Sequence, residues 1–376
     1  MKKNISILHS NYIIDGVMQE LTPAQILLDC SGIEAPAPQD ADLDFIADET
    51  LDPTIGNYIF ESSRIQPYLL AVRAAKKQVP LSFASAHTRL RIATALLDTL
   101  WRKGRFRIGD IALKASWEWN ISEVGGAAAF YASVQAAGEY LDSFDIKLKS
   151  YSVKETRRES SVSFVPVLSS ENGAETEFLD TPYKTPRPRM SAEAACPCEM
   201  DPNPHSWLVY IPFDTADYRL GGSLLAQTLG LGGGVAPDVR DTDYFIDCYE
   251  VVRELVEDGV LLSAVTVGDG GLLPAVKKLG AGKVGATIDI SDIMRANNET
   301  QIVRLLFGEV PGVVVQIKDI DFDYLDAELL LQDVAFFPLG HPVPDTNAVK
   351  VKASAKSGIQ NILESLIRNQ GGEGED

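Results

Sequence analysis

The segment 261–279 has the residue spacing most suggestive of chemistry in this sequence: an apolar strand, a glycine turn and the start of a helix. The turn contains Asp269, Gly270 and Gly271, and Pro274 fits the first turn of the helix, where its missing N–H costs nothing. Such a turn directs free backbone N–H groups toward whatever lies above it, which suits an anion such as phosphate. The carboxylate of Asp269 implies that a bound phosphate would be accompanied by a cation. An ordinary Asp-Gly-Gly turn without a ligand is the alternative, and the residues alone favour it.

The composition is that of a globular chain with an acidic surface. The chain has 376 residues, of which 45% are hydrophobic, enough for a large core and more consistent with two domains than with one. Acidic residues outnumber basic ones by 53 to 34, and no basic stripe with interleaved aromatic residues occurs, so we expect no nucleic-acid partner. The chain start lacks a secretory signal and no apolar run has membrane-spanning length, so we expect a cytoplasmic protein without a membrane partner.

The cysteines show no spacing typical of a disulfide framework or a zinc site. Cys196 and Cys198 flank a proline, but no second Cys or His pair stands at zinc-site distance. We therefore expect loop thiols in a reducing compartment.

Composition and periodicity divide the chain into two domains and three less regular segments. Residues 1–54 are acidic and contain prolines, which predicts a weakly structured arm or an irregular cap. The other expected boundaries are 55–170 for an N-terminal domain, 171–204 for a linker or long loop, 205–356 for a C-terminal domain and 357–376 for a tail with a short helix at 359–367 and a disordered end.

The N-terminal domain is predicted to combine helices with a sheet. Its periodicity indicates helices at 66–79, 87–101 and 127–141 and strands at 111–119, 146–152 and 161–167. The pair Trp117 and Trp119 is interpreted as core. Arg89, Arg91 and Arg102 flank the second helix, and we interpret them as a solvated face.

The C-terminal domain alternates strands with helices. Strands are predicted at 207–212, 261–267, 284–290, 313–317 and 335–337, and helices at 224–229, 241–257, 272–279 and 292–306. This alternation predicts an α/β (α+β) domain in which helices cover a sheet.

Seven segments, taken in their order along the chain, match the motifs of one known family. They are Arg-Leu-Arg-Ile-Ala-Thr-Ala-Leu at 89–96, the strand 111–119, the helix 127–139, the strand 149–156, Leu-Gly-Gly-Ser at 220–223, Asp-Gly-Gly-Leu at 269–272 and Leu-Phe-Gly-Glu-Val-Pro-Gly at 306–312. Together they resemble the second, C-terminal synthetase half of phosphoribosylformylglycinamidine synthase over roughly residues 80–353. The resemblance does not reach that enzyme's glutaminase domain, which we expect this chain to lack.

The resemblance implies both a fold and a chemistry. The fold is the two-domain unit of the aminoimidazole ribonucleotide synthetase-like superfamily: a small sheet-bearing N-terminal domain, which pairs with another copy, and a larger α/β C-terminal domain. The chemistry belongs to purine biosynthesis, where ATP activates an amide oxygen as a phosphate ester that ammonia displaces. Acidic residues would hold magnesium for this reaction.

The resemblance also implies site residues. A nucleotide or phosphate would be bound by Lys149, Gly221, Gly222, Ser223, Asp269, Gly270 and Gly271, and a metal by Asp269 and Glu309. Each has a structural alternative: the glycines and Ser223 as turns and a capped helix, and Lys149 as a solvated charge at a strand end.

Three departures from the family pattern remove acidic groups. Ala93-Thr94 stands where the family usually has Gly-Glu, and Val265-Thr266 replaces a His-Asp pair. The segment 148–151, Leu-Lys-Ser-Tyr, replaces Gly-Lys-Asp-Ser and so keeps the lysine but loses the acid. Because magnesium prefers carboxylate ligands, these changes indicate that binding of ATP or ADP with magnesium is weakened or lost.

These observations leave several hypotheses open. The first is a degenerate, non-catalytic assembly or regulatory unit that forms a homodimer, or pairs with a related synthetase half, through the N-terminal domain sheet. The second is an active ATP-dependent amidine-forming (FGAR to FGAM) or ligase-type enzyme, with replacement ligands such as Asp42, Asp44 or Asp48 from the acidic arm. A small-molecule binding module with a different ligand is the third.

Overall fold

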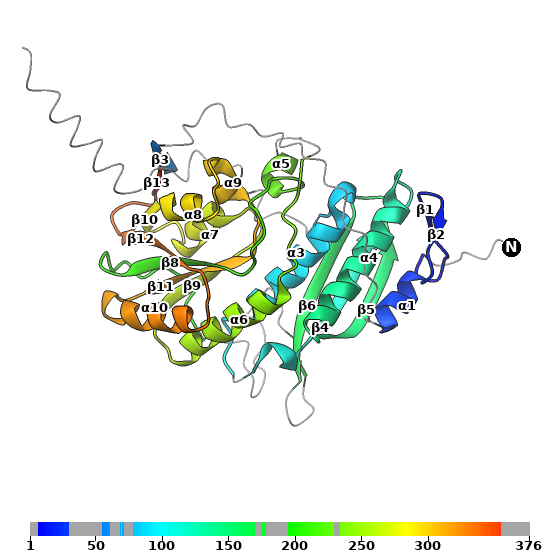
Figure 1. Ribbon diagram of the computed structural model, residues 1–376, viewed down its shortest axis with the longest axis horizontal. Coiled ribbons are helices and arrows are strands. Elements are labelled where there is room, and N and C mark those ends of the chain that lie inside the picture. Colours follow the sequence, from blue (N-terminus) through cyan, green and yellow to red (C-terminus); the bar gives the residue numbers. More distant parts are fainter. Residues whose placement is uncertain are drawn as a thin grey trace, which may run out of the picture.

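The computed structural model describes residues 7–29, 55–60, 68, 70, 78–104, 106–169, 175–177, 195–228 and 234–354. Within these ranges the chain forms two bodies side by side, each built around its own sheet (Figure 1). The fold is a mixed α+β arrangement of a smaller N-terminal and a larger C-terminal domain, which confirms the predicted fold class. In the described part of the chain, no helix is both long and apolar enough to cross a membrane.

The smaller domain contains a four-stranded sheet in the order β5-β4-β6-β7. Its strands are β4 (Ile111–Trp119), β5 (Lys147–Glu155), β6 (Ser161–Ser169) and β7 (Glu175–Glu177). Helices α3 (Ala84–Leu97) and α4 (Gly126–Ser143) pack on one face, and the short helices η1 (Leu81–Phe83) and η2 (Ile108–Asp110) connect these elements. Alternate residues of β4 are buried, and Trp117 and Trp119 are fully buried. The interpretation of this Trp pair as core is confirmed.

The described part of the N-terminal arm packs as a cap on the smaller domain. It contains β1 (Ile13–Ile14), β2 (Val17–Met18) and α1 (Pro23–Asp29), with α1 against α4. Tyr12 is buried and its ring lies 5.2 Å from that of Tyr131, and Ile26 and Leu27 are buried as well. Of the two predicted alternatives for residues 7–29, a weakly structured arm or an irregular cap, the structure has the cap, because their few apolar side chains converge on α4. Residues 30–54, including Asp42, Asp44 and Asp48, lie outside the described residues.

The larger domain contains a seven-stranded sheet in the order β3-β13-β10-β12-β8-β11-β9. The strands are β3 (Ile55–Phe60), β8 (Trp207–Pro212), β9 (Leu261–Val267), β10 (Gly285–Asp289), β11 (Gly312–Ile317), β12 (Phe337–Val343) and β13 (Val349–Ser354). Of the six pairings between these described strands, only that of β10 with β13 is parallel. The strand β3 pairs with β13 and so lies in this sheet, although it precedes the smaller domain in the sequence.

Helices cover both faces of the larger sheet. The helices α6 (Thr242–Glu257) and α10 (Phe322–Leu331) lie on one face, and α7 (Leu272–Leu279), α8 (Ser291–Ala296) and α9 (Ile302–Phe307) on the other (Figure 1). The short helices α5 (Leu224–Thr228) and η3 (Asp319–Asp321) complete the domain.

Two predicted elements of this domain differ in the structure. The single predicted helix 292–306 is two short helices, because Asn298 takes a positive φ of 48° that ends the first. The predicted strand 335–337 begins only at Phe337 and runs to Val343 as β12. Helix α10 and strand β13 are additional elements. The predicted tail helix 359–367 and most of the predicted helix 66–79 and of the linker 171–204 lie outside the described residues.

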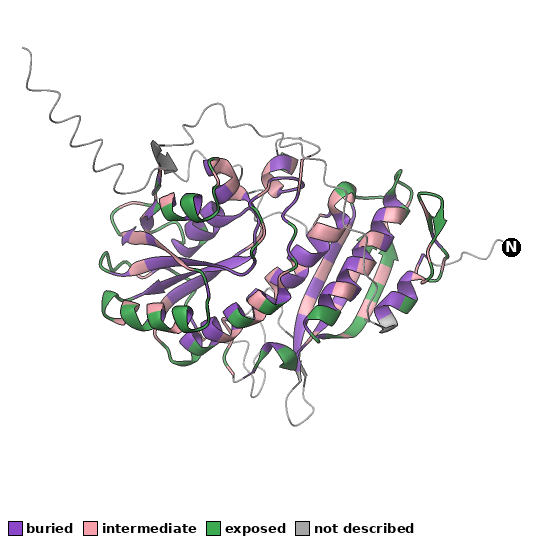
Figure 2. Ribbon diagram, in the orientation of Figure 1, coloured by how far each residue is buried: buried purple, intermediate pink, exposed green. Residues whose placement is uncertain are grey.

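One continuous hydrophobic cluster joins the two domains (Figure 2). Phe144 of the smaller domain contacts Phe245 of α6 with ring centroids 5.1 Å apart. The buried guanidinium of Arg253 on α6 donates to the carbonyl oxygens of Leu100 and Arg102, at 2.7 and 2.8 Å. The domains are thus held by both apolar packing and hydrogen bonds.

Helix α3 lies between the two domains, and this location corrects the interpretation of its arginines. Arg89 is 5% exposed and pairs with Asp238 of the larger domain at 2.5 Å. The side chain of Arg91 is 11% exposed and pairs with Asp269, and Arg102 is half-buried. The predicted solvated face is therefore wrong for Arg89 and Arg91, because α3 contacts the smaller sheet on one side and the larger domain on the other.

Candidate functional site

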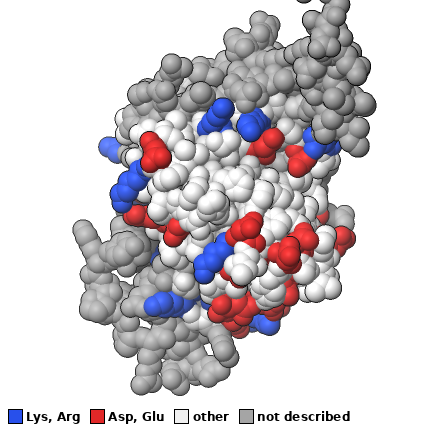
Figure 3. Space-filling view, turned by 90° about the vertical axis from the view of Figure 1, so that its left-hand side faces the viewer, with Lys and Arg blue, Asp and Glu red and all other residues white. Residues whose placement is uncertain are grey.

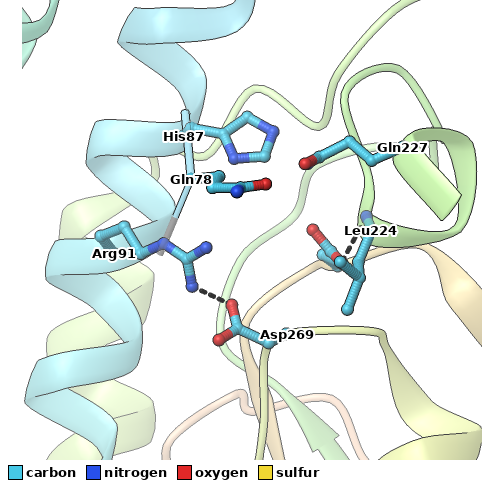
Figure 4. Close-up of a pocket in the computed structure, with 7 residues that line it drawn as sticks. Gln78, His87, Arg91, Leu224, Gln227 and Asp269 are labelled. Carbon is cyan, nitrogen blue, oxygen red and sulfur yellow. Dashed lines mark hydrogen bonds and ion pairs between the residues drawn. The ribbon is translucent and has the colours of Figure 1, made fainter. Parts of the chain in front are cut away.

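A small pocket lies between α3 and the loops at one end of the larger sheet (Figure 4). Its cavity volume is about 10 Å³, which leaves room for about one water molecule and none for an organic ligand without rearrangement of the side chains. Six of its seven lining residues have polar or charged side chains, and the seven come from five segments of the chain: Gln78, His87, Arg91, Leu224, Gln227, Asp269 and Glu309. The segments 220–223, 269–272 and 306–312, which are far apart in the sequence, meet here.

The glycine turn between β9 and α7 has the predicted strand–turn–helix form. Gly270 and Gly271 take positive φ values of 84° and 87°, which favour glycine over other residues. A Cβ on Gly271 would lie 2.7 Å from the Cα of Phe307. The turn therefore needs Gly271 to let its backbone approach the 306–312 segment.

The Leu-Gly-Gly-Ser loop packs just as closely. The N–H of Gly221 donates to the carbonyl oxygen of Val235 at 2.7 Å. Gly222 has a φ of 68°, and a Cβ there would lie 2.8 Å from Nε2 of the buried His87. The Ser223 hydroxyl accepts a hydrogen bond from the Ala226 N–H at 3.2 Å, at the start of α5. These residues hold the loop against α3.

The side chain of Glu309 binds the backbone N–H groups that face the pocket. Its Oε1 accepts hydrogen bonds from Gly270 N–H at 2.8 Å and from Leu224 N–H at 3.0 Å. Glu309 is only 7% exposed, and burial, followed by the nearby charge of Asp269, raises its pKa to about 7. A carboxyl group of the chain itself thus takes the N–H of Gly270, one of the donors predicted to face a phosphate, and that of the neighbouring Leu224.

The carboxylate of Asp269 points toward Arg91 across the pocket and forms an ion pair with it (Figure 4). Next to this pair, burial and then the charge of Arg91 lower the pKa of His87 to about 4, so the imidazole is neutral at pH 7. The hydroxyl of buried Tyr68 donates to the Gly270 carbonyl at 3.0 Å. The charged and polar groups of the pocket are therefore largely engaged with one another.

The positions at which this sequence departs from the family pattern carry structural contacts. The Thr94 hydroxyl donates to the Leu90 carbonyl at 2.8 Å, and its side chain lies against Gly268. The Thr266 hydroxyl donates to Asp98 at 2.8 Å and accepts from the Trp101 indole at 2.9 Å. These hydroxyls connect α3 to β9, and both are weaker metal ligands than the carboxylates they replace.

The predicted metal residues Asp269 and Glu309 lie at the same pocket. No group of three or more His, Cys, Asp or Glu side chains within the described ranges is placed to hold a metal ion. Lys149 is exposed on β5, the strand of the smaller sheet farthest from β6 and α3, and does not line the pocket. The structure thus brings together all the predicted site residues except Lys149.

Five pocket residues were not predicted as site residues from the sequence: Gln78, His87, Arg91, Leu224 and Gln227. His87 and Arg91 are one helical turn apart on α3 and so share a face, which is a signal that the sequence contains. Gln78 and Gln227 have no comparable signal, because their approach to the pocket depends on how the chain folds between distant segments.

Comparisons with known proteins agree with the resemblance seen in the motifs. No family model matches the chain. It is 25% identical over 295 residues to a probable phosphoribosylformylglycinamidine synthase, chloroplastic/mitochondrial, of Arabidopsis thaliana, which covers 76% of this chain but only 19% of that protein. The chain therefore spans about a fifth of the length of this curated relative.

Among solved structures, similarity extends to phosphoribosylformylglycinamidine synthase II from Thermotoga maritima, with a TM-score of 0.46 and 12% identity over 78% of this chain and 41% of that one. The hydrogenase maturation protein HypE in complex with ATP also has a TM-score of 0.46, with 13% identity over 71% of this chain and 76% of that one. The match to the curated relative confirms that this chain is related in sequence to phosphoribosylformylglycinamidine synthase.

Proposed function

We propose that this chain is a non-catalytic relative of phosphoribosylformylglycinamidine synthase that acts as an assembly or regulatory unit and has a weakened nucleotide site. The observation that carries the proposal is the pair of hydrogen bonds from Leu224 N–H and Gly270 N–H to Glu309. A phosphate at these donors would have to displace a carboxyl group that is tethered to the same fold and therefore present at a high effective concentration.

The acidic groups that would bind the magnesium of a nucleotide are weakened as well. Asp269 is the other carboxylate of the pocket and is partly exposed, and its charge is neutralised by Arg91. Where the family pattern has further acids, Thr94 and Thr266 form hydrogen bonds within the protein. Magnesium with a triphosphate needs several anionic ligands, which supports weak or absent binding of the Mg-nucleotide.

Calorimetric titration of the full chain with Mg-ATP at pH 7.5 tests this proposal. We expect no saturable heat at millimolar nucleotide, and the same result for Asp269→Asn. Asp217→Asn is a matched control, because Asp217 also pairs with an arginine, Arg219, but is exposed and lies outside the pocket lining. Tight binding by the wild type and by the control, lost in Asp269→Asn, would contradict the proposal and favour an active ATP-dependent enzyme.

The strand β5 is an edge of the smaller sheet and supports a role in assembly. Among the described strands it pairs only with β4, and its side chains Lys147, Lys149 and Lys154 are exposed. Pairing with a second copy would bring like charges together, whereas the edge of a related but different half can be complementary. We therefore favour a related synthetase half over a second copy as the partner.

Size-exclusion chromatography with light scattering tests the assembly proposal. We expect the chain alone to have the mass of one copy, 40.9 kDa, and to co-elute with a purified phosphoribosylformylglycinamidine synthase at the summed mass. Substituting Lys147, Lys149 and Lys154 with serine should weaken that complex at least tenfold, because it removes three charges from the edge. A wild-type chain that does not co-elute, or a complex that is indifferent to the substitutions, would contradict the proposed edge pairing.

A further inference from the structure

The outer face of α10 and the preceding η3 turn form an exposed apolar stripe. Ile320, Leu331 and Leu330 are 86%, 77% and 64% exposed, and Tyr324 is 40% exposed. Ile320, Tyr324 and Leu331 recur at spacings of four and seven residues, so they follow one side of the helix. The opposite side carries Leu325 and Leu329 into the core, both fully buried. This helix therefore also exposes apolar side chains on the side that points away from the core.

Acidic side chains surround this stripe. The segment 318–333 contains six Asp or Glu residues and a single basic one, Lys318. Figure 3 shows acidic side chains gathered in the lower half of the face on which α10 lies. The Tyr324 hydroxyl donates to Asp258, the residue that follows α6, at 2.7 Å. That hydrogen bond, then burial and the charges of Asp258, Glu328 and Glu254, raise the pKa of Tyr324 to about 12.

Exposed apolar groups that stand singly need no explanation, whereas several that are contiguous and rimmed by charge mark an interaction surface. A second copy fits this surface poorly, because its own acids would face those of the first. The surface is instead complementary to a partner that has an apolar stripe flanked by basic side chains. A helix can supply both at the spacing that the stripe presents.

We propose that the stripe formed by Ile320, Tyr324, Leu330 and Leu331 is a docking surface for a basic amphipathic helix of a partner protein. The stripe spans eleven residue steps, or roughly 17 Å at about 1.5 Å per residue, which matches three helical turns. The apolar side chains of the partner pack on the stripe, and its lysines or arginines face Asp323, Glu328 and Glu254. The inference does not depend on the state of the pocket, which lies next to α3.

The test uses the full chain and a fluorescently labelled, 18-residue amphipathic helix of leucine and lysine, with binding followed by anisotropy. We expect saturable binding that weakens at least tenfold in the double variant Ile320→Ser/Leu331→Ser. Binding should weaken several-fold between 50 and 500 mM salt, because salt screens the acidic rim. Val124→Ser/Met18→Ser is the matched control, since Val124 and Met18 are 98% and 63% exposed elsewhere, and its affinity should equal that of the wild type.

Amide hydrogen exchange of the complex shows where on the chain the peptide binds. Protection of residues 319–331 and of the C-terminal part of α6 is expected. Equal affinities of the double variant and the control would overturn the proposal, because binding would then be a non-specific attraction to an acidic chain. Sedimentation showing a dimer that the Ile320→Ser/Leu331→Ser variant disrupts would also overturn it, since the stripe would then belong to a contact between two copies.

Discussion

Replacing Glu309 with alanine is expected to lower the free energy of unfolding by about 3 kcal/mol, because the buried Gly270 N–H and the half-buried Leu224 N–H lose their acceptor and an unsatisfied buried donor costs about 1–3 kcal/mol. The donors belong to Leu224 and Gly270, which hold two loops of the larger domain together through this one side chain. Urea denaturation of the wild type and the variant gives the difference. A loss below about 1 kcal/mol would show that the Glu309 side chain is not a significant link between the loops.

The same substitution should expose the donors to an external anion. We expect millimolar inorganic phosphate to raise the melting temperature of Glu309→Ala but not that of the wild type, because only the variant has vacant N–H groups. Equal stabilisation of both proteins by phosphate would mean that the anion binds elsewhere, and that Glu309 does not block its site.

The Glu309→Gln variant isolates the effect of ionisation. Glutamine retains an acceptor oxygen for both donors but cannot ionise. The folded protein raises the pKa of Glu309 from 4.5 to about 7. The native state therefore holds this proton to higher pH than the unfolded chain does. The stability that protonated Glu309 contributes to the folded state is complete below pH 4.5 and is lost as the pH rises through 7. The stability of the wild type relative to Glu309→Gln should fall by about 3 kcal/mol between pH 4.5 and 8. A difference independent of pH would contradict the raised pKa.

Replacing Arg253 with methionine is expected to cost about 3–5 kcal/mol, because several carbonyl acceptors lose a charged donor and each unsatisfied buried acceptor costs about 1–3 kcal/mol. Arg253 is 3% exposed, and its guanidinium donates to the carbonyl oxygens of Leu100, Arg102 and Gly104, which belong to the smaller domain. Methionine fills the volume but leaves these carbonyls without their donor. Urea denaturation should show the loss, and Arg253→Lys should recover only part of it, because a single ammonium group cannot reach all three carbonyls.

Arg295→Met is the control for this substitution. Arg295 pairs with Asp292 on the surface of α8, where such a pair contributes roughly 0–1 kcal/mol. If Arg253→Met destabilises the protein no more than Arg295→Met does, the hydrogen bonds of Arg253 do not hold the two domains together.

The sequence alone determined those features that depend on local periodicity and backbone chemistry. The alternation in 111–119 predicted β4, and the apolar strand followed by Gly270 and Gly271 predicted β9, the turn and α7. The ordered motifs identified the related family, because their residue types and spacing survive even at 25% identity. Local patterns failed for the segment 292–306, since a short break at Asn298 leaves the apolar spacing intact.

Only the tertiary structure decided what the site residues contact. The charge of Arg91 fits a solvated helix face until α3 is placed against the larger domain, where Asp269 pairs with it. The sequence predicts Glu309 as a metal ligand, whereas in the fold its side chain accepts hydrogen bonds from the N–H groups of Leu224 and Gly270. Leu224 and Glu309 are separated by 85 positions, and Arg91 and Asp269 by 178. Contacts over such separations are set by how the elements pack, which periodicity within a segment does not encode.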